Sequence, residues 1–270
     1  MSAASPLMGD RFAGQSVIEE LLREQGTQTP RSRIARILGF TPLRDESRPW
    51  YLGAQGEIIV GAKLEKLPPE WNVFHALPVG KKDTDIDHLV VGPAGVFTIN
   101  TKHHRGKVVW VADRSFMISG QTKSYIPKAE AETAIVKKLT DQHYPGVSSV
   151  RPIIAVVGAK QLTIRKEPRQ VKVIDANQLT RWLTKQPQVL ASSGVAELVA
   201  LFDRPDAWRV TELPVGDLLG RYKTLEAEVR SARKVRGLWS LVGAGALFLF
   251  GTLVAHLAPA IVGLMAGLGR

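Results

Sequence analysis

Hydrophobic residues recur in the middle of the chain with the two-residue period of half-buried β-strands. Short runs of this kind, rich in Val, Ile and Phe, are separated by turn sequences such as Gly92-Pro93-Ala94-Gly95 and Asp113-Arg114. They predict a meander of strands over 71–77, 86–91, 95–101, 106–112 and 115–118.

Segments with the helical period flank this meander. Residues 54–67 have one such pattern, and Leu-Pro-Pro-Glu ends it. Residues 127–142 begin with a proline, which suits the first turn of a helix, and Ala131, Ile135 and Leu139 form the predicted apolar stripe.

The chain then returns to strands and helices in alternation. Residues 151–157 are almost entirely apolar, which predicts a strand that is buried on both faces. A short strand is expected at 171–174, and helices at 177–184 and 195–202. This order of elements predicts a mixed α/β sheet with helices on both sides.

The last part of the chain has a different pattern. Residues 237–269 contain no Asp, Glu, Lys or Arg. About 20 residues at roughly 1.5 Å each cross a hydrocarbon core of about 30 Å, so 238–257 is long enough to span a membrane. We expect one transmembrane helix. Pro259 leaves open an alternative, a hairpin of two shorter helices.

Basic residues are distributed unevenly around this apolar run. Only Arg270 follows it, whereas four basic residues lie immediately before it: Arg230, Arg233, Lys234 and Arg236. The positive-inside rule therefore predicts a single-pass membrane protein whose N-terminal part is in the cytoplasm.

These patterns divide the chain into four predicted parts. Residues 1–50 form an N-terminal extension, partly disordered or helical, and 51–205 form the folded α/β domain. Residues 206–236 form a polar helix with a basic juxtamembrane linker, and 237–269 form the transmembrane segment.

Composition narrows the classes of function. The formal net charge of +11 favours a polyanionic partner, either nucleic acid or an acidic membrane surface, although solubility alone is a competing explanation. The chain has no cysteine, which excludes disulfides, thiolate metal sites and a cysteine nucleophile.

Candidate chemistry gathers where two predicted strands meet. Asp85 and Asp87 share one face of the first strand, and Asn100 and Lys102 share a face of the second. The intervening turn makes the strands neighbours, and Glu57 on the preceding helix adds a carboxylate. A hard cation such as Mg²⁺ prefers carboxylate oxygens, and a nearby lysine can stabilise negative charge that develops on a phosphoryl group.

Other residues near these strands have two open interpretations. Asp85 either binds the metal or solvates the start of its strand. His103 and His104 either contact phosphate or metal or are incidental surface histidines, and the second interpretation is favoured. Four basic residues flank the strands and either contact a nucleic-acid backbone or form a solvated rim: Lys81, Lys82, Arg105 and Lys107.

Several short motifs resemble one known family. They are Gly56-Glu57, Asp85-Ile86-Asp87, Gly92 to Phe97, and Ile99-Asn100-Thr101-Lys102 followed by Gly106. In this combination, over residues 53–139, the chain resembles the nuclease-related domain, the NERD family. That resemblance implies a PD-(D/E)XK restriction-endonuclease-like fold, a mixed sheet flanked by helices.

The resemblance also implies site roles. Glu57 and Asp87 match metal-binding carboxylates, and Lys102 matches the catalytic lysine. Asn100 departs from the family pattern, because it occupies the position of the glutamate in Glu-X-Lys and brings no charge, which weakens Mg²⁺ binding. Glu130 matches a position where the family tends to have glutamine, and is either a replacement for that charge or a solvent-facing residue.

Two functions remain open at this point. The first is a membrane-anchored, Mg²⁺-dependent nuclease that hydrolyses the phosphodiester bonds of DNA. The second is a catalytically inactive nuclease-like domain that binds nucleic acid or a protein at the membrane. The retained Asp87 and Lys102 favour the first, and Asn100 favours the second.

Overall fold

A computed structural model describes residues 7–26, 31–79, 85–144, 150–208 and 216–268, with side chains up to 258. The chain forms two compact units. The first comprises residues 1–24 and 46–219, and the second comprises 25–45 and 220–270. The four-part division predicted from the sequence stays a prediction.

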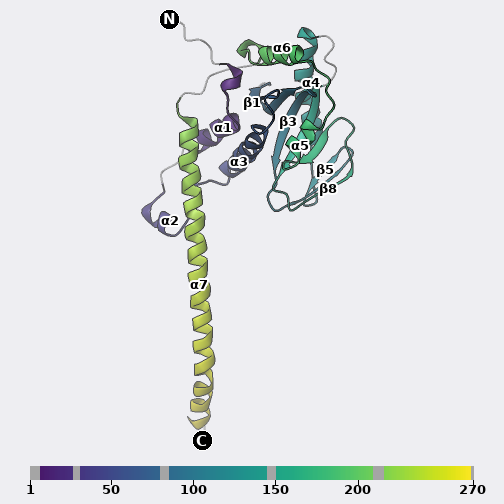
Figure 1. The fold of residues 1–270 in the computed structure, drawn as a ribbon. Helices are drawn as coiled ribbons and strands as arrows, with labels where there is room; N and C mark the ends of the chain where they lie inside the picture. Colours follow the sequence, from purple (N-terminus) through teal and green to yellow (C-terminus); the bar gives the residue numbers. More distant parts are fainter. Residues whose placement is uncertain (1–6, 27–30, 80–84, 145–149, 209–215, 269–270) are drawn as a thin grey trace. The chain divides into compact units, whose positions relative to one another are not determined.

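A five-stranded sheet in the order β1-β2-β3-β7-β9 is the centre of the first unit (Figure 1). The first three strands pair antiparallel, and β3, β7 and β9 pair parallel. Their bounds are Asn72–Pro78 (β1), Asp85–Gly92 (β2), Gly95–His103 (β3), Val150–Val157 (β7) and Lys172–Asp175 (β9). The predicted mixed sheet is confirmed.

Helices cover both faces of this sheet. Apolar residues of α3 (Ser47–Leu64) and α5 (Leu179–Thr184) share one core with Phe97 and Ile99 of β3. On the other face, α4 (Tyr125–His143) and α6 (Ser192–Phe202) share a core with Leu89 and Val96. The shorter elements of this unit are η1 (Met8–Asp10), α1 (Gln15–Gly26, of which 25–26 belong to the second unit) and η2 (Pro205–Ala207).

A second sheet, in the order β6-β5-β4-β8, packs beside the first. Its strands are β4 (Val108–Ala112), β5 (Ser115–Ile118), β6 (Gln121–Lys123) and β8 (Gln161–Lys166). The sequence predicted β4 and β5 but not β6 or β8. These two lie at the edges of the sheet, and no side chain of either strand is fully buried. The strand β6 (Gln-Thr-Lys) has no apolar residue, and β8 has only two, Leu162 and Ile164, so the strand pattern is absent from one and short in the other.

The buried face of α4 differs from the predicted stripe. Ala131 and Ile135 are exposed, whereas Ala129, Thr133 and Val136 are buried. The reason is that this helix lies over polar positions of β3: the hydroxyls of Thr98 and Thr133 are 2.5 Å apart. The helix therefore turns polar as well as apolar residues toward the sheet, and its buried face differs from the apolar stripe predicted from the sequence.

The second unit contains α2 (Arg33–Ile37) and the long helix α7 (Leu218–Leu268, which begins two residues before this unit), the extended helix in Figure 1. The helix α7 is continuous through Pro259, so the hairpin alternative is not observed. All residues from 237 to 258 are exposed. Those 22 residues extend for about 33 Å, so α7 is long and apolar enough to cross a membrane.

Candidate metal centre

Asp87 is held at the point where β2 and β3 begin to separate. The two strands pair with His88 opposite Ile99, which places Asp87 one residue beyond that pair. The backbone N–H of Thr101 donates a hydrogen bond to Asp87 Oδ2 over 2.5 Å. The side chain is only 7% exposed. The strand pairing therefore fixes both the position and the orientation of this carboxylate.

Three carboxyl groups meet at this point. Glu57, Asp85 and Asp87 each contribute an oxygen, and these oxygens lie within 4.8 Å of one another. Glu57 comes from α3, which approaches β3 closely because Gly56 has no side chain. A Cβ atom at position 56 would be only 2.9 Å from the Cβ of His103. Gly56 thus allows α3 to bring Glu57 close to β3.

Burial raises the pKa values of all three groups, and their proximity adds to the effect at Glu57 and Asp85. Burial raises the pKa of Glu57 well above its usual range, and the neighbouring Asp87 and Asp85 add to the effect. Burial and then Asp87 raise the pKa of Asp85 to about 7. Burial also raises the pKa of Asp87, although Lys102 and the Thr101 N–H oppose this. A cation among the three oxygens would relieve their repulsion.

The available oxygen atoms fit a hard divalent cation. Within the described residues, Glu57 Oε2 and Asp85 Oδ2 are buried and have no hydrogen-bond partner. Buried polar atoms are ordinarily paired, so two unpaired carboxylate oxygens at one place are available to a cation. A set of carboxylate oxygens without nitrogen or sulfur suits Mg²⁺ or Mn²⁺. Asp85, for which the sequence left two interpretations, lies inside this group.

Asn100 has a carboxylate beside it, which comes from α4. Its Nδ2 donates a hydrogen bond to Glu132 Oε2, and Glu132 is 4% exposed. Lys128 Nζ lies 3.6 Å from the other oxygen of Glu132. Burial raises the pKa of Glu132, with Lys128 opposing this and Asp87 adding to it. The charge that is missing from position 100 is therefore supplied nearby by another element.

Glu130, which the family resemblance suggested for this purpose, lies elsewhere. Its carboxylate is 3.9 Å from Arg114 in an ion pair with exposed Arg114. Sequence reasoning missed Glu132 because it followed the wrong stripe of α4. The detectable signal was the helical spacing of Glu132 from Ala129 and Val136, both of which are buried.

Lys102 extends from the same face of β3 as Asn100. Its ammonium lies 5.1 Å from the centre of the Tyr125 ring, at the start of α4. Its positive charge opposes the rise in the pKa values of Glu57 and Asp87 that burial causes. The sequence thus correctly placed Asp87, Asn100, Lys102 and Glu57 near one another, and their chemical roles stay predictions.

The two histidines that follow Lys102 make structural contacts. His103 Nδ1 lies 2.9 Å from the backbone oxygen of Leu52. The ring of His104 stacks on that of Tyr125, with the ring centres 5.8 Å apart. Both side chains are half-buried, and these contacts are to neighbouring elements of the fold.

Of the four basic residues that were predicted to contact phosphate, two lie within the described residues. Arg105 and Lys107 are exposed in the turn between β3 and β4, on either side of Gly106, which has a φ of 74°. Lys81 and Lys82 lie outside the described residues. A nucleic-acid-binding role for all four stays a prediction.

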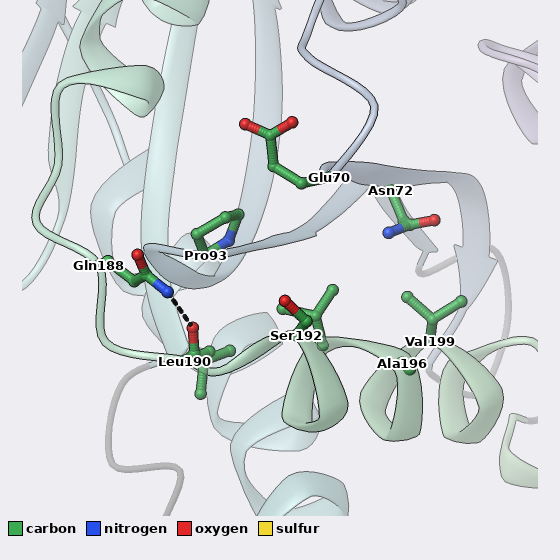
Figure 2. Close-up of a pocket in the computed structure, with 9 residues that line it drawn as sticks. Glu70, Asn72, Pro93, Gln188, Leu190, Ser192, Ala196 and Val199 are labelled. Atoms are coloured by element: carbon green, nitrogen blue, oxygen red, sulfur yellow. Dashed lines mark hydrogen bonds between the residues drawn. The ribbon is translucent and has the colours of Figure 1, made fainter.

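A pocket in the same unit is separate from the carboxylates. It has a volume of about 360 Å³ and is lined by residues that include Glu70, Pro93, Gln188 and Ser192 (Figure 2). None of its lining residues belongs to the group around Asp87. We therefore assign the candidate chemistry to the carboxylates and not to this pocket.

Comparison with known proteins agrees with this site. Residues 52–157 match the family model described as "Nuclease-related domain" (NERD). No curated protein and no solved structure matches the chain significantly. The matched residues run from α3 to the end of β7 and include every carboxylate described above. Residues 52–157 of this chain therefore match the nuclease-related domain, and a long apolar helix that is a candidate membrane span follows them in the sequence.

Proposed function

We propose that this protein is a membrane-anchored, Mg²⁺-dependent nuclease that hydrolyses the phosphodiester bonds of DNA. One observation carries the proposal: oxygens of Glu57, Asp85 and Asp87 converge within 4.8 Å in a nuclease-related domain. A buried group of like charges destabilises a fold unless an opposite charge compensates it, and strongly perturbed pKa values gather at functional sites.

The residues divide the work as follows. Glu57, Asp85 and Asp87 would hold the cation. When bound, Mg²⁺ supplies Lewis-acid polarisation of the scissile phosphate. The Thr101 N–H holds Asp87 in place, so this ligand needs no reorganisation on binding. The ammonium of Lys102 would stabilise negative charge that develops on the phosphoryl oxygens.

Asn100 and Glu132 would act together in place of the usual strand glutamate. A carboxylate only accepts hydrogen bonds, so Glu132 must hold the Nδ2 side of the amide. This leaves Asn100 Oδ1, which is buried and without a partner among the described residues, as a neutral oxygen ligand. The negative charge of Glu132 would then act on the cation indirectly, because Asn100 lies between them.

The net charge of +11 supports DNA as the substrate. Arg105 and Lys107 lie shortly after β3, the strand that carries Asn100 and Lys102, and are exposed. They are therefore available to phosphates next to the scissile bond. We further propose that α7 crosses the membrane once and that the nuclease-related domain is cytoplasmic. The four basic residues before Gly237 support this orientation.

The second candidate function is binding without cleavage. The neutral Asn100 favours it, because the strand that ordinarily carries a metal carboxylate has none at this position. In that case the domain would bind DNA through its basic residues in a salt-dependent manner, with no requirement for a metal.

A cleavage assay distinguishes the two functions. The full chain in detergent micelles is incubated with labelled DNA and either Mg²⁺ or Mn²⁺. We expect metal-dependent cleavage that falls by at least about 10³-fold in Asp87→Asn, because loss of the Lewis acid removes several kcal/mol of stabilisation from the transition state. Asp113→Asn, an identical change at a turn where Asp113 pairs with Lys166, is the control that keeps activity.

Three outcomes would count against the nuclease. Cleavage that persists in Asp87→Asn would come from a contaminant or another site. Cleavage that needs no divalent cation would exclude the proposed chemistry. Absence of cleavage in both the natural chain and Asn100→Glu, together with salt-sensitive DNA binding, would establish the binding module instead.

A further inference from the structure

Residues 31–40 of the second unit form a short, well-defined structure. Ser32 caps the helix α2, because its hydroxyl accepts a hydrogen bond from the N–H of Ala35 over 3.1 Å. Gly39, with a φ of 73°, ends the helix, and the N–H of Phe40 reaches back to the oxygen of Ala35 over 2.9 Å. Such paired start and stop signals fix the conformation of this segment.

The 31–40 segment is attached to α7 at one specific turn. The indole N–H of Trp239 donates to the backbone oxygen of Ile37 over 2.8 Å. Arg31 forms an ion pair of 2.9 Å with Glu228. At Gly39 a Cβ atom would lie 2.7 Å from the backbone nitrogen of Arg236, so only glycine permits this approach. These contacts place the segment where the apolar part of α7 begins.

The 31–40 segment exposes large apolar side chains. Ile34 is 69% exposed, Ile37 64%, Leu38 42% and Phe40 60%. Four such residues within seven positions are more than the scattered apolar residues of an ordinary protein surface. They are continuous with the exposed apolar residues of α7 that begin at Leu238.

Basic residues occur both in the 31–40 segment and in the part of α7 that it contacts. Arg33 and Arg36 are exposed in the segment itself. On α7, no acidic residue occurs between Val229 and Ser240, and four basic residues do: Arg230, Arg233, Lys234 and Arg236. Basic residues next to a span attract anionic lipid headgroups, and tryptophan is enriched at the membrane interface.

We propose that the 31–40 segment lies in the interface of a lipid bilayer and binds anionic phospholipids, an inference that rests on α7 being a membrane span. Ile34, Ile37 and Phe40 enter the boundary between headgroups and acyl chains. Arg33 and Arg36, with the basic residues of α7, face the phosphates. The contacts at Trp239 and Gly39 then set the depth at which α7 crosses the bilayer.

The depth of a probe at position 40 tests this proposal. Because the chain contains no cysteine, Phe40→Cys accepts a single environment-sensitive NBD label without further changes. The labelled full chain is reconstituted in vesicles of equimolar phosphatidylcholine and phosphatidylglycerol, with or without a spin-labelled lipid as quencher. Two labelled variants serve as references: Leu249→Cys inside the apolar part of α7, and Val189→Cys, an exposed apolar residue of the first unit.

We expect lipid quenching at positions 40 and 249 but not at 189. Quenching at 249 without quenching at 40 overturns the interfacial segment and leaves the membrane span intact. Absence of quenching at 249 refutes the span itself. An NBD emission at position 40 that is blue-shifted but insensitive to the quencher shows that protein, either another part of this chain or a second copy, covers the segment, and this also overturns the proposal.

A second arm tests the headgroup contacts. Quenching at position 40 should be stronger with phosphatidylglycerol than with phosphatidylcholine alone. We expect Arg33→Gln with Arg36→Gln to remove that difference. The matched control, Arg165→Gln with Arg181→Gln, removes the same charge from exposed sites of the first unit and should retain it. An unchanged lipid response in the first double variant overturns the role of the two arginines.

Discussion

Two groups of buried titratable side chains lie next to each other in the central sheet and behave in opposite ways. Asp87 belongs to the carboxylate group with Glu57 and Asp85, whereas the next residue of β2, His88, pairs with His75 of β1. Neighbouring residues of a strand point to opposite faces, so the side chains of Asp87 and His88 leave β2 on opposite sides.

The histidine pair shares one hydrogen bond between complementary groups. The two Nδ1 atoms are 2.8 Å apart, and the rings are almost perpendicular, at 88°. Burial lowers the pKa of His75 to about 4 and that of His88 well below its usual range, so both rings are neutral. One neutral imidazole donates and the other accepts, which pairs both Nδ1 atoms, whereas the buried Nε2 of His88 has no hydrogen-bond partner among the described residues.

The carboxyl groups cannot form such a pair when they are all ionised, because carboxylates only accept hydrogen bonds and repel one another. The contrast separates two meanings of a buried polar residue. A neutral complementary pair contributes to the fold, whereas a group of like charges with unpaired oxygens is a candidate site for a cation.

The largest expected difference between the two groups is in the response to metal. Saturating Mg²⁺ or Mn²⁺ should stabilise the full chain by about 2.7 kcal/mol at 100 times the Kd. We expect Glu57→Gln to remove most of this stabilisation, because it deletes a charged ligand. Thermal unfolding with and without the cation measures the effect. A variant that responds to metal as the natural chain does would place the metal away from Glu57.

The contribution of Glu132 should be smaller than that of Glu57. If it holds Asn100 as an indirect partner of the cation, Glu132→Gln should weaken metal binding by roughly 10- to 100-fold, as loss of an outer-shell partner does. Calorimetric titration with Mn²⁺ measures the affinity. Glu130→Gln is the matched control on the same helix, since Glu130 pairs with Arg114, and it should change nothing. Equal effects of the two changes would refute the role of Glu132.

The histidine pair should affect stability alone. His75→Leu leaves His88 without its hydrogen-bond partner in a fully buried position, which costs about 1–3 kcal/mol. Chemical denaturation measures this loss. The stabilisation by metal should remain unchanged in the same variant. A lower metal affinity in His75→Leu would show that the two groups are coupled through β2, and the distinction between them would fail.

The features that could be predicted from the sequence are those determined by residues close together along the chain. The strands β2 and β3 have buried apolar residues and a glycine turn, so their pairing and the neighbourhood of Asp87, Asn100 and Lys102 followed from the spacing. The edge strands β6 and β8 lacked this signal. The family resemblance, more than any pattern, identified Glu57.

The missed features depend on contacts between elements. Glu132 is buried because α4 lies over the polar positions of β3, which the helix sequence alone does not reveal. The contact between His75 and His88 needs the register of β1 against β2, in which the two residues are directly opposite. Asp85 could be placed in the metal group only when the position of α3 was known.

The smallest and most specific prediction concerns pH. The pKa of Asp85 is about 7, so below that value a cation must displace its proton. Each further unit of acidification should then reduce metal affinity about tenfold, which is about 1.4 kcal/mol. Metal-induced stabilisation should consequently rise with pH and level off above about 7. Thermal unfolding across this range, with and without Mg²⁺, measures it.

Without metal, the two groups should have opposite dependences on pH. Asp85 titrates at about 7 in the fold instead of 3.8, so its contribution to stability is present at low pH and is lost as pH rises through about 7. His75 titrates at about 4 instead of 6.5, so its contribution is present above 6.5 and is lost as pH falls through about 4. We therefore expect Asp85→Asn to raise metal-free stability near pH 7 and to weaken the pH dependence of the metal effect, part of which remains because the pKa values of Glu57 and Asp87 are raised too. By contrast, His75→Leu should reduce only the loss of stability in acid. A metal effect that is independent of pH in the natural chain would mean that Asp85 is already ionised and that the carboxylate group is less strained than its geometry indicates.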